Sequence, residues 1–246
     1  MRNYNLGFID DETIYNHVKE TAMLYRSKIL DLKEFNKNII DPIKLTFDAK
    51  VYGKSLKEVI VSECVRQIDK TNSNHIGYFH QNLFKYAGNG WEVPEKGFDV
   101  INKERHIFVE MKNKHNTMND ASSQKTYIKM QSKILEDDAA VCMLVEVIAK
   151  KSGNNKWNAK VNGQNFSHDR IRRVSMDKFY EVVFGDALAF FKLCKALPDI
   201  LDDVIAEIGE TSAANKVYKE LSAISPDVLK SIYLLAFEKY DGFDQL

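Results

Sequence analysis

The spacing of apolar residues predicts two helices in the first part of the chain. Behind an aspartate at position 10 or 11, apolar side chains recur every three to four residues, which predicts an amphipathic helix over residues 11–36. Ser55 followed by Glu58 has the pattern of a capping box, so a second helix should begin there and run to about Lys70.

Short runs of β-branched and aromatic residues in the middle of the chain predict a sheet. A Gly-Asn-Gly turn signal precedes the runs 98–101 and 107–111, and the polar residues between these runs indicate a hairpin. Residues 122–136 predict a helix. The nearly continuous apolar run 139–148 suits a strand that is covered on both faces, as in a parallel or mixed sheet.

The rest of the chain is predicted to begin with a long loop and to end in helices. Residues 152–169 are polar and contain two turn signals, Gly-Asn-Asn and Asn-Gly, which favour a loop. Residues 170–174 predict a further strand, Ser175 caps a helix that ends near Gly185, and the remainder is predicted to be helical. The order of these elements predicts an α/β fold, with a mixed β-sheet core flanked by helices.

Length and composition limit the domain organisation. With 246 residues, 44% of them hydrophobic, the chain can bury one large core, so we expect a single domain over residues 1–246. Its core is expected at about residues 50–185, with helical segments at 1–49 and 186–246. The first residues are polar and acidic and no apolar run approaches ~18 residues, so we expect a cytoplasmic protein with no membrane partner.

The cysteines and the missing motifs argue against several other kinds of site. Cys64, Cys142 and Cys194 lie far apart inside apolar patterns, which predicts reduced core thiols and neither a disulfide framework nor a zinc site. The six histidines include no HExxH pattern. No Gly-x-x-x-x-Gly-Lys-Ser/Thr run occurs, so no nucleotide cofactor is predicted.

The distribution of charge is more informative than its balance. The chain has 35 basic and 35 acidic residues, which taken alone argues weakly against a nucleic-acid partner. Residues 103–133 and 150–178 nevertheless carry an excess of Lys and Arg, whereas residues 199–246 carry an excess of Asp and Glu. The central segments could therefore build a groove for a polyanion, and ordinary solvated faces are the alternative.

Two charged residues interrupt an otherwise apolar predicted strand. Because alternate side chains of a strand share a face, Glu110 and Lys112 should point one way, and Val109 and Met111 the other way into the core. Asp99, on the preceding strand, can place its carboxylate opposite them. Phosphodiester hydrolysis needs a hard cation, and Mg²⁺ prefers carboxylate oxygens. The pattern therefore predicts a magnesium site made by Asp99, Glu110 and the carbonyl of Met111, where Lys112 holds the attacking water. An exposed hairpin with a cross-strand ion pair is the alternative.

A further carboxylate, Glu63, falls on the apolar stripe of the second predicted helix. A carboxylate in that place is costly to bury unless a cation or a metal ion pairs with it. Glu63 could complete the metal site, and a structural ion pair is an equal alternative.

The residues of the predicted hairpin resemble a known motif. GFDV followed by FVEMKNKHNTMN resembles the PD-(D/E)XK nuclease superfamily, and more closely the type II restriction endonucleases that cut GGNCC. The similarity runs from SECVRQIDK through IGYFHQNLF and WEVPEKGFDV to RIRRVSMDKFYEVVFG, over more than half of the chain. It implies a restriction-endonuclease-like fold with Asp99, Glu110 and Lys112 at the catalytic positions and Glu63 at the helical acidic position. Phe98 stands where the name of the superfamily has proline, a position that varies widely in it.

Polar and basic residues around this motif are candidates for contacts with DNA. Those directly after the catalytic strand are Asn113, Lys114, His115 and Asn116. Those on the following helix, expected to contact the DNA backbone, are Gln124, Lys125 and Lys129. Arginine to guanine is the commonest specific pairing, which favours Arg170, Arg172 and Arg173, beside His168, as guanine readers. Phosphate binding by these arginines is the alternative.

The resemblance implies a sequence-specific type II restriction endonuclease that cuts double-stranded DNA with magnesium. A palindromic target is matched by a protein with twofold symmetry, so a homodimer is expected. Two alternatives are another nuclease of the same fold, for repair or junction resolution, and a DNA-binding module that no longer cuts. Intact Asp99, Glu110 and Lys112 speak against the second of these.

Overall fold

The structure is a computed structural model that describes residues 2–26, 31–38, 40–115, 118–210 and 216–237. The chain divides into two compact units. The sheet unit consists of Met1–Ala22 and His75–Ile208, and the helical unit consists of Met23–Asn74 and Gly209–Leu246.

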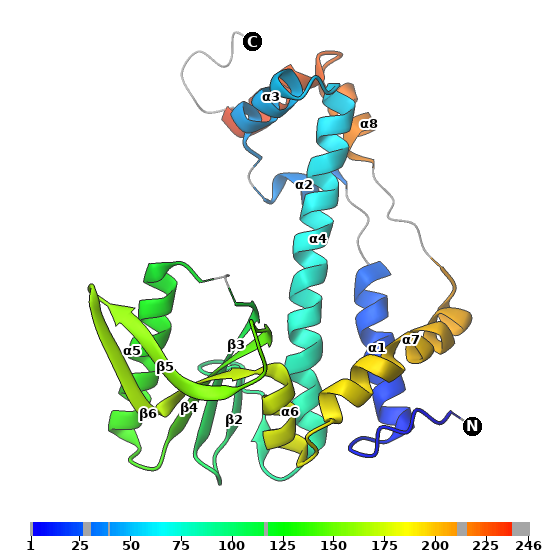
Figure 1. Ribbon diagram of the computed structural model, residues 1–246. Helices are drawn as coiled ribbons and strands as arrows, with labels where there is room; N and C mark the ends of the chain where they lie inside the picture. Colours follow the sequence, from blue (N-terminus) through cyan, green and yellow to red (C-terminus); the bar gives the residue numbers. More distant parts are fainter. Residues whose placement is uncertain (1, 27–30, 39, 116–117, 211–215, 238–246) are drawn as a thin grey trace. The chain divides into compact units, whose positions relative to one another are not determined.

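A mixed β-sheet forms the centre of the sheet unit (Figure 1). In the order in which they pair, its strands are β1 (Trp91–Glu92), β2 (Val100–Asn102), β3 (Ile107–Lys114), β4 (Val141–Ile148), β6 (Gln164–Ser175) and β5 (Asn154–Val161). The central strands β3, β4 and β6 are parallel, whereas β1, β2 and β5 join the sheet through antiparallel pairs. This mixed sheet with its flanking helices confirms the predicted α/β fold class.

Helices cover both faces of the sheet. Helix α5 (Asp120–Glu136) packs on one side, which we call the α5 face and which includes Phe108, Leu144 and Ile171. The opposite face packs against α6 (Met176–Phe184), α7 (Ala189–Ile208) and the part of α1 (Asp11–Arg26) that belongs to this unit. Strand β4 alternates between the two clusters, with Cys142 and Leu144 on the α5 face and Met143 and Val145 on the other. Burial on both sides explains its apolar sequence and confirms the strand predicted there.

The helical unit has a core of its own. It contains α2 (Leu32–Asn36), α3 (Pro42–Val51), α8 (Val217–Ile224), α9 (Val228–Phe237) and the first part of α4 (Leu56–Leu83). The residues at the centre of this core are Phe35, Leu45, Val59, Ile60, Val217, Leu221 and Ile232. The predicted capping box opens α4, because the Glu58 side chain accepts the backbone N–H of Ser55 at 2.8 Å.

The single helix predicted over residues 11–36 is wrong. The structure has α1 and α2 in its place, and residues 27–30 between them lie outside the described part of the chain. Asp31 has extended backbone angles and its side chain accepts the N–H of Glu34 at 2.8 Å, so it is the N-cap of a separate helix.

Helix α4 runs beyond the predicted end at Lys70 and reaches Leu83. Phe79 and Leu83 are buried in the core of the sheet unit, and this tertiary packing continues the helix through an aromatic-rich sequence. Gly77 lies within this helix where an added Cβ would stand 3.0 Å from the side-chain oxygen of Asn113. The glycine therefore permits a close approach between α4 and the end of β3.

The loop predicted over residues 152–169 is also wrong, because these residues form most of a hairpin. Strands β5 and β6 are joined at Asn162 and Gly163, which have φ values of 50° and 80°. Both angles are positive, as in the tight turns that join antiparallel strands, so Asn-Gly marks a hairpin turn. Along β5, Trp157, Ala159 and Val161 are buried and alternate with exposed residues, which is the signature of a half-buried strand.

The cysteines follow the prediction in part. Cys64 and Cys142 are buried, but Cys194 on α7 is exposed. Its neighbour Leu193 occupies the buried stripe of that helix, and one residue turns the side chain by about 100° away from it. No helix in the described ranges is both long enough and apolar enough to cross a membrane.

Candidate active site

Strand β3 carries charged side chains on one face only. Val109 is fully buried in the core opposite α5, and Met111 packs against the same core. Glu110 and Lys112 alternate with them and lie on the α5 face, next to Phe108. The Lys112 ammonium lies 3.9 Å from a carboxylate oxygen of Glu110, and the Glu110 side chain is only 12% exposed.

Asp99 lies beside this pair. It directly precedes β2, whose Val100 pairs with Val109, and the Asp99 N–H donates to the Val109 carbonyl at 2.8 Å. One oxygen of the Asp99 carboxylate accepts the backbone N–H of Met111 at 2.7 Å. The side chain of Gln81 in α4 donates to the Asp99 carbonyl at 2.9 Å. The structure thus brings together Asp99, Glu110 and Lys112, and Met111 between the last two is tied to Asp99.

Lys129 of α5 also reaches this cluster. Its ammonium forms an ion pair with Glu110, donates to the Gly97 carbonyl at 2.7 Å and lies 4.4 Å from the centre of the Phe98 ring. From the sequence we expected Lys129 to contact the DNA backbone. In the structure two ammonium groups, from Lys112 and Lys129, neutralise one nearly buried carboxylate.

The oxygens of the cluster fit a magnesium ion. Mg²⁺ is commonly held in proteins by one or two carboxylates, with waters and substrate phosphates as the other ligands. Asp99 and Glu110 supply two carboxylates on neighbouring chain segments, and no cysteine or histidine in the described residues joins them in a group that would favour a softer metal. The Met111 carbonyl belongs to the same stretch of strand.

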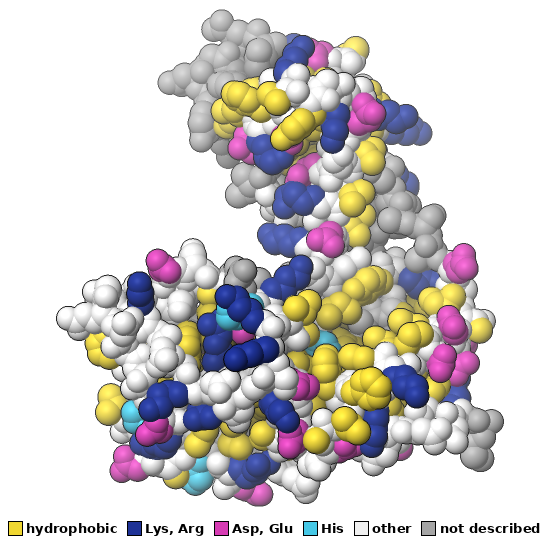
Figure 2. All heavy atoms as spheres, in the orientation of Figure 1, with side chains coloured by type: hydrophobic (Ala, Val, Ile, Leu, Met, Phe, Trp, Pro, Cys, Tyr) yellow, Lys and Arg dark blue, Asp and Glu magenta, His cyan; other side chains and the backbone are white. Residues whose placement is uncertain are grey.

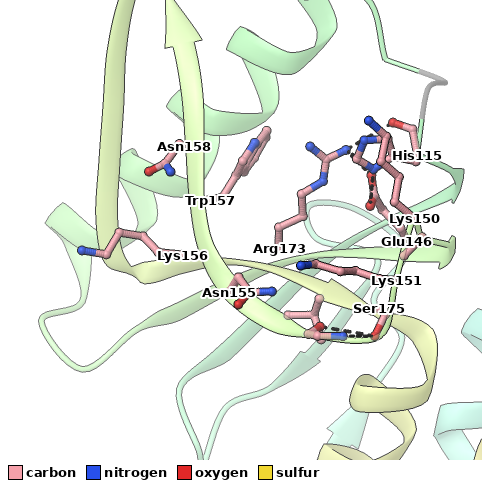
Figure 3. Close-up of a pocket in the computed structure, with 13 residues that line it drawn as sticks. His115, Glu146, Lys150, Lys151, Asn155, Lys156, Trp157, Asn158, Arg173 and Ser175 are labelled. Atoms are coloured by element: carbon pink, nitrogen blue, oxygen red, sulfur yellow. Dashed lines mark hydrogen bonds and ion pairs between the residues drawn. The ribbon is translucent and has the colours of Figure 1, made fainter.

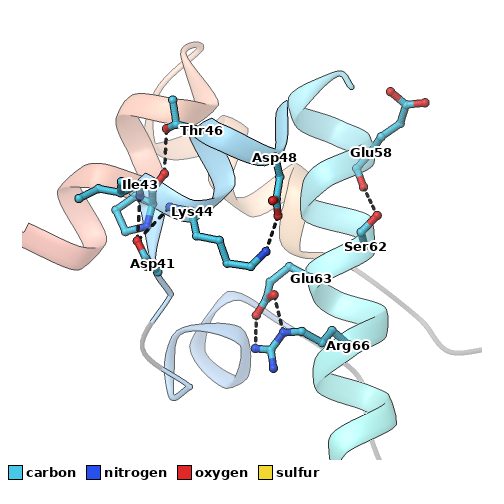
Figure 4. A network of polar contacts seen from close by, with 10 residues as sticks. Asp41, Ile43, Lys44, Thr46, Asp48, Glu58, Ser62, Glu63 and Arg66 are labelled. Carbon is cyan, nitrogen blue, oxygen red and sulfur yellow. Dashed lines mark hydrogen bonds and ion pairs between the residues drawn. The ribbon is translucent and has the colours of Figure 1, made fainter. Parts of the chain in front are cut away.

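Glu63 lies in the helical unit, where it has partners of its own (Figure 4). Its side chain is 8% exposed and accepts hydrogen bonds from Arg66 at 2.5 and 2.7 Å and from Gln67 at 3.1 Å. Burial raises the pKa of the Glu63 carboxyl, but these hydrogen bonds outweigh burial and the pKa is lowered overall. This is the structural ion pair of the two alternatives, and a metal-binding role for Glu63 stays a prediction.

A second buried carboxylate, Glu146, was not singled out from the sequence. Glu146 pairs with Lys112 across the parallel strands β3 and β4, so both side chains lie on the α5 face. It is 2% exposed, forms an ion pair with Arg173 and lies 2.9 Å from Nδ1 of His115. Burial raises the pKa of Glu146, and the hydrogen bonds from Arg173 and His115 reverse this and lower the pKa. One acidic residue within the apolar run 139–148 was the available signal.

The three arginines of β6 have different surroundings. Arg173 is in register with Leu144, which in turn pairs with Glu110, so Arg173 shares the α5 face with the cluster. The Arg170 guanidinium donates instead to the backbone carbonyls of Asp138 and Ala140. Arg172 donates to the side chain and the carbonyl of Asn154, at 2.9 and 2.5 Å.

The other candidates for DNA contacts lie near the sheet or on α5. Asn113 and Lys114 end strand β3, and Asn116 lies outside the described residues. On α5, Gln124 is half-buried and Lys125 is exposed. The ring of His168 on β6 accepts the backbone N–H of Arg170 at 3.1 Å. Their roles in binding DNA stay predictions.

Asp99 directly before one strand of an antiparallel pair, and Glu110-x-Lys112 on the other strand, which parallel strands continue, form an arrangement of the restriction-endonuclease-like class. The comparisons with known proteins agree with this class. The chain belongs to the Eco47II restriction endonuclease family, whose model matches residues 6–206. It is therefore a sequence-specific DNA endonuclease, as predicted.

Two curated relatives are similar over most of the chain. The type II restriction enzyme Sau96I of Staphylococcus aureus is 33% identical over 227 residues, which cover 88% of this chain and 85% of the relative. The type II restriction enzyme Eco47II of Escherichia coli is 30% identical over 217 residues, which cover 82% of this chain and 89% of the relative.

Proposed function

We propose that this protein hydrolyses both strands of a short palindromic DNA site with magnesium, using Asp99, Glu110 and Lys112. The observation that carries the proposal is the clustering of two carboxylates and an ammonium: Glu110 and Lys112 lie together on the α5 face of β3, and the Asp99 carboxylate accepts the N–H of Met111 between them. We propose GGNCC as the target class, on the resemblance of the sequence to enzymes that cut this site.

The roles of the residues follow from their chemistry. Asp99, Glu110 and the Met111 carbonyl would hold Mg²⁺, which supplies Lewis acidity toward the scissile phosphate and makes water a better nucleophile. Lys112 orients the attacking water and offsets the negative charge that builds on the phosphate. The hydrogen bond from the Met111 N–H fixes the Asp99 carboxylate, so one ligand is already oriented by the backbone.

A palindrome has twofold symmetry, and we propose a homodimer that places one site on each strand. The family match spans residues 6–206 and so includes parts of both units, which supports one nuclease domain built from the two. We place the enzyme in the cytoplasm because an enzyme that cuts DNA must act where the DNA is.

Plasmid cleavage tests the proposal. We expect discrete fragments with magnesium and no cleavage with a chelator, and sequencing of the fragment ends should give one short palindrome. Lys112→Ala should abolish cleavage while binding to DNA persists. Lys195→Ala, an exposed lysine of α7, is the matched control and should cut normally.

Other outcomes would favour the alternatives. Cleavage that depends on branched or damaged DNA and not on sequence would indicate a repair or junction-resolving nuclease. Binding without cleavage by the wild-type protein would indicate a module that has lost its activity. Sedimentation at the mass of one chain, with and without DNA, would refute the homodimer.

A further inference from the structure

A basic cavity lies beside the active site on the same face of the sheet. Its volume is about 310 Å³, and it opens between the end of β3, strand β4, the β4–β5 turn and strands β5 and β6. The charged and titratable side chains that line it are His115, Glu146, Lys150, Lys151, Lys156 and Arg173 (Figure 3). Figure 2 shows Lys and Arg side chains gathered beside a histidine over this part of the sheet.

The lysines of the cavity leave its charge largely uncompensated. Lys150 and Lys151 are exposed and form no ion pair with any of the described residues. Lys156 pairs with Asp169 at 2.5 Å. The carboxylate in the lining, Glu146, is buried and already paired with Arg173. The cavity therefore presents positive charge to an incoming group and would favour an anion.

Arg173 keeps donors available for such an anion. Its Nη2 forms an ion pair with Glu146, donates to the His115 carbonyl at 3.2 Å and lies 2.9 Å from Nδ1 of the His115 ring. Its Nε is buried and has no hydrogen-bond partner in the described part of the chain. A buried donor without an acceptor is unfavourable, so a small movement of the guanidinium toward an oxygen bound in the cavity would relieve it. Arginine binds phosphate oxygens well because its planar donors match their geometry.

The cavity is placed to contact DNA that lies in the active site. Glu110, Leu144 and Arg173 pair in a row across three parallel strands, so Arg173 lies two strand spacings, about 10 Å, from Glu110. Glu146 is one strand from Lys112. Both groups face the same side of the sheet as the catalytic residues.

We propose that this cavity binds a phosphate group of the DNA backbone next to the one that is cut. The proposal rests on the proposed function. Arg173 is the anchor, Lys150 and Lys151 contribute at the rim, and Glu146 and His115 are positioning residues that hold the Arg173 guanidinium. The cavity supplies affinity and register and no base readout.

The salt dependence of DNA binding tests this role. In a Lys112→Ala background, which prevents cleavage, the dissociation constant of a labelled duplex that contains GGNCC is measured from about 50 to about 200 mM salt. Each lost phosphate contact should lower the slope of log K against log salt by about 0.9 and weaken binding about fivefold near 0.15 M salt. Lys150→Gln and Lys151→Gln should each show part of this effect, because Arg173 still holds the phosphate, and Lys195→Gln, outside the cavity, should show none.

Arg173→Lys tests the anchor, because it keeps the charge beside Glu146 and removes the planar donors. It should weaken binding and leave the salt slope nearly unchanged. Should Arg173→Lys fail to fold, the exposed Lys150 and Lys151 variants still decide the matter.

Several results would overturn the proposal. Unchanged affinity and slope in the cavity variants, with discrete cleavage by the wild-type enzyme, would refute the cavity and leave the proposed function standing. Thermal stabilisation by inorganic phosphate that Arg173→Lys abolishes, with DNA binding unaffected, would assign the cavity to free phosphate instead. Wild-type protein that neither binds nor cuts duplex DNA would refute the proposed function itself.

Discussion

Substitution of Asp99 separates its two roles, as a proposed metal ligand and as an acceptor for the backbone of β3. Asp99→Asn removes the negative charge but keeps a side-chain oxygen that can accept the Met111 N–H, now bound at 2.7 Å. Asp99→Ala removes both. Comparison of the two variants therefore isolates the hydrogen bond from the charge.

The expected magnitudes differ for stability and for activity. Loss of the acceptor leaves the Met111 N–H unsatisfied, which costs about 1–3 kcal/mol, and each kcal/mol lowers Tm by about 2–4 °C in a protein of this size. Asp99→Asn should remain within about 1 kcal/mol of the wild type. Both variants should lose at least about a hundredfold in cleavage rate, equivalent to about 3 kcal/mol of transition-state stabilisation.

Thermal unfolding with a chelator present measures stability, calorimetric titration with Mn²⁺ measures metal binding, and plasmid cleavage measures activity. The wild-type protein and Lys195→Ala serve as controls. Asp99→Asn that cuts at the wild-type rate would refute the role of Asp99 in metal binding. Equal unfolding temperatures for Asp99→Asn and Asp99→Ala would refute the role of its hydrogen bond.

Three further predictions concern buried or paired charges. Glu146→Ala should lower the free energy of unfolding by roughly 3 kcal/mol. This is the low end of the range for breaking a buried ion pair, because the Arg173 side chain is 30% exposed. An unchanged denaturation midpoint would contradict this prediction. Burial lowers the pKa of His80 to about 4, so between about pH 6.5 and pH 4 the unfolded chain binds a proton that the folded protein does not. The free energy of unfolding should therefore be full above about pH 6.5 and fall by about 3 kcal/mol toward pH 4. Denaturation curves at several pH values should show this fall for the wild type and a flatter dependence for His80→Gln. Lys129→Met removes the ammonium that is paired with the Glu110 carboxylate and repels a metal ion there. Calorimetric titration should therefore show Mn²⁺ binding that is tighter by about 1 kcal/mol. Weaker binding would show instead that Lys129 supports the site.

The arrangement of the candidate catalytic residues could be predicted because its geometry is local. The alternation of a strand fixes that Glu110 and Lys112 share a face, and a short hairpin brings Asp99 next to them. The strand β4 was also predictable from its own residues, because a strand that is buried on both faces is apolar at nearly every position.

The remaining residues of the site depend on contacts that sequence spacing does not encode. Lys129 reaches Glu110 because α5 packs on one particular face, and Arg173 reaches Glu146 because β4 and β6 pair in one register. Neither the packing nor the register can be derived from one sequence without the tertiary structure.

Two errors in the elements have different causes. For β5, a signal was present and misjudged: Asn162-Gly163 follows an alternation of Trp157, Ala159 and Val161, which favours a hairpin over a loop. For α4, the continuation past Lys70 depends on burial of its aromatic residues in a core assembled from distant segments.

The glycine within α4 limits how this enzyme can be made more robust. Replacing a helical glycine by alanine is a standard way to raise thermal stability, worth up to about 1 kcal/mol. At Gly77 an added methyl group would stand 3.0 Å from the side-chain oxygen of Asn113, one residue after Lys112, so the Asn113 side chain would have to shift to make room for it. Protein engineers who seek a heat-tolerant version should therefore leave this position unchanged and work on helices away from β3.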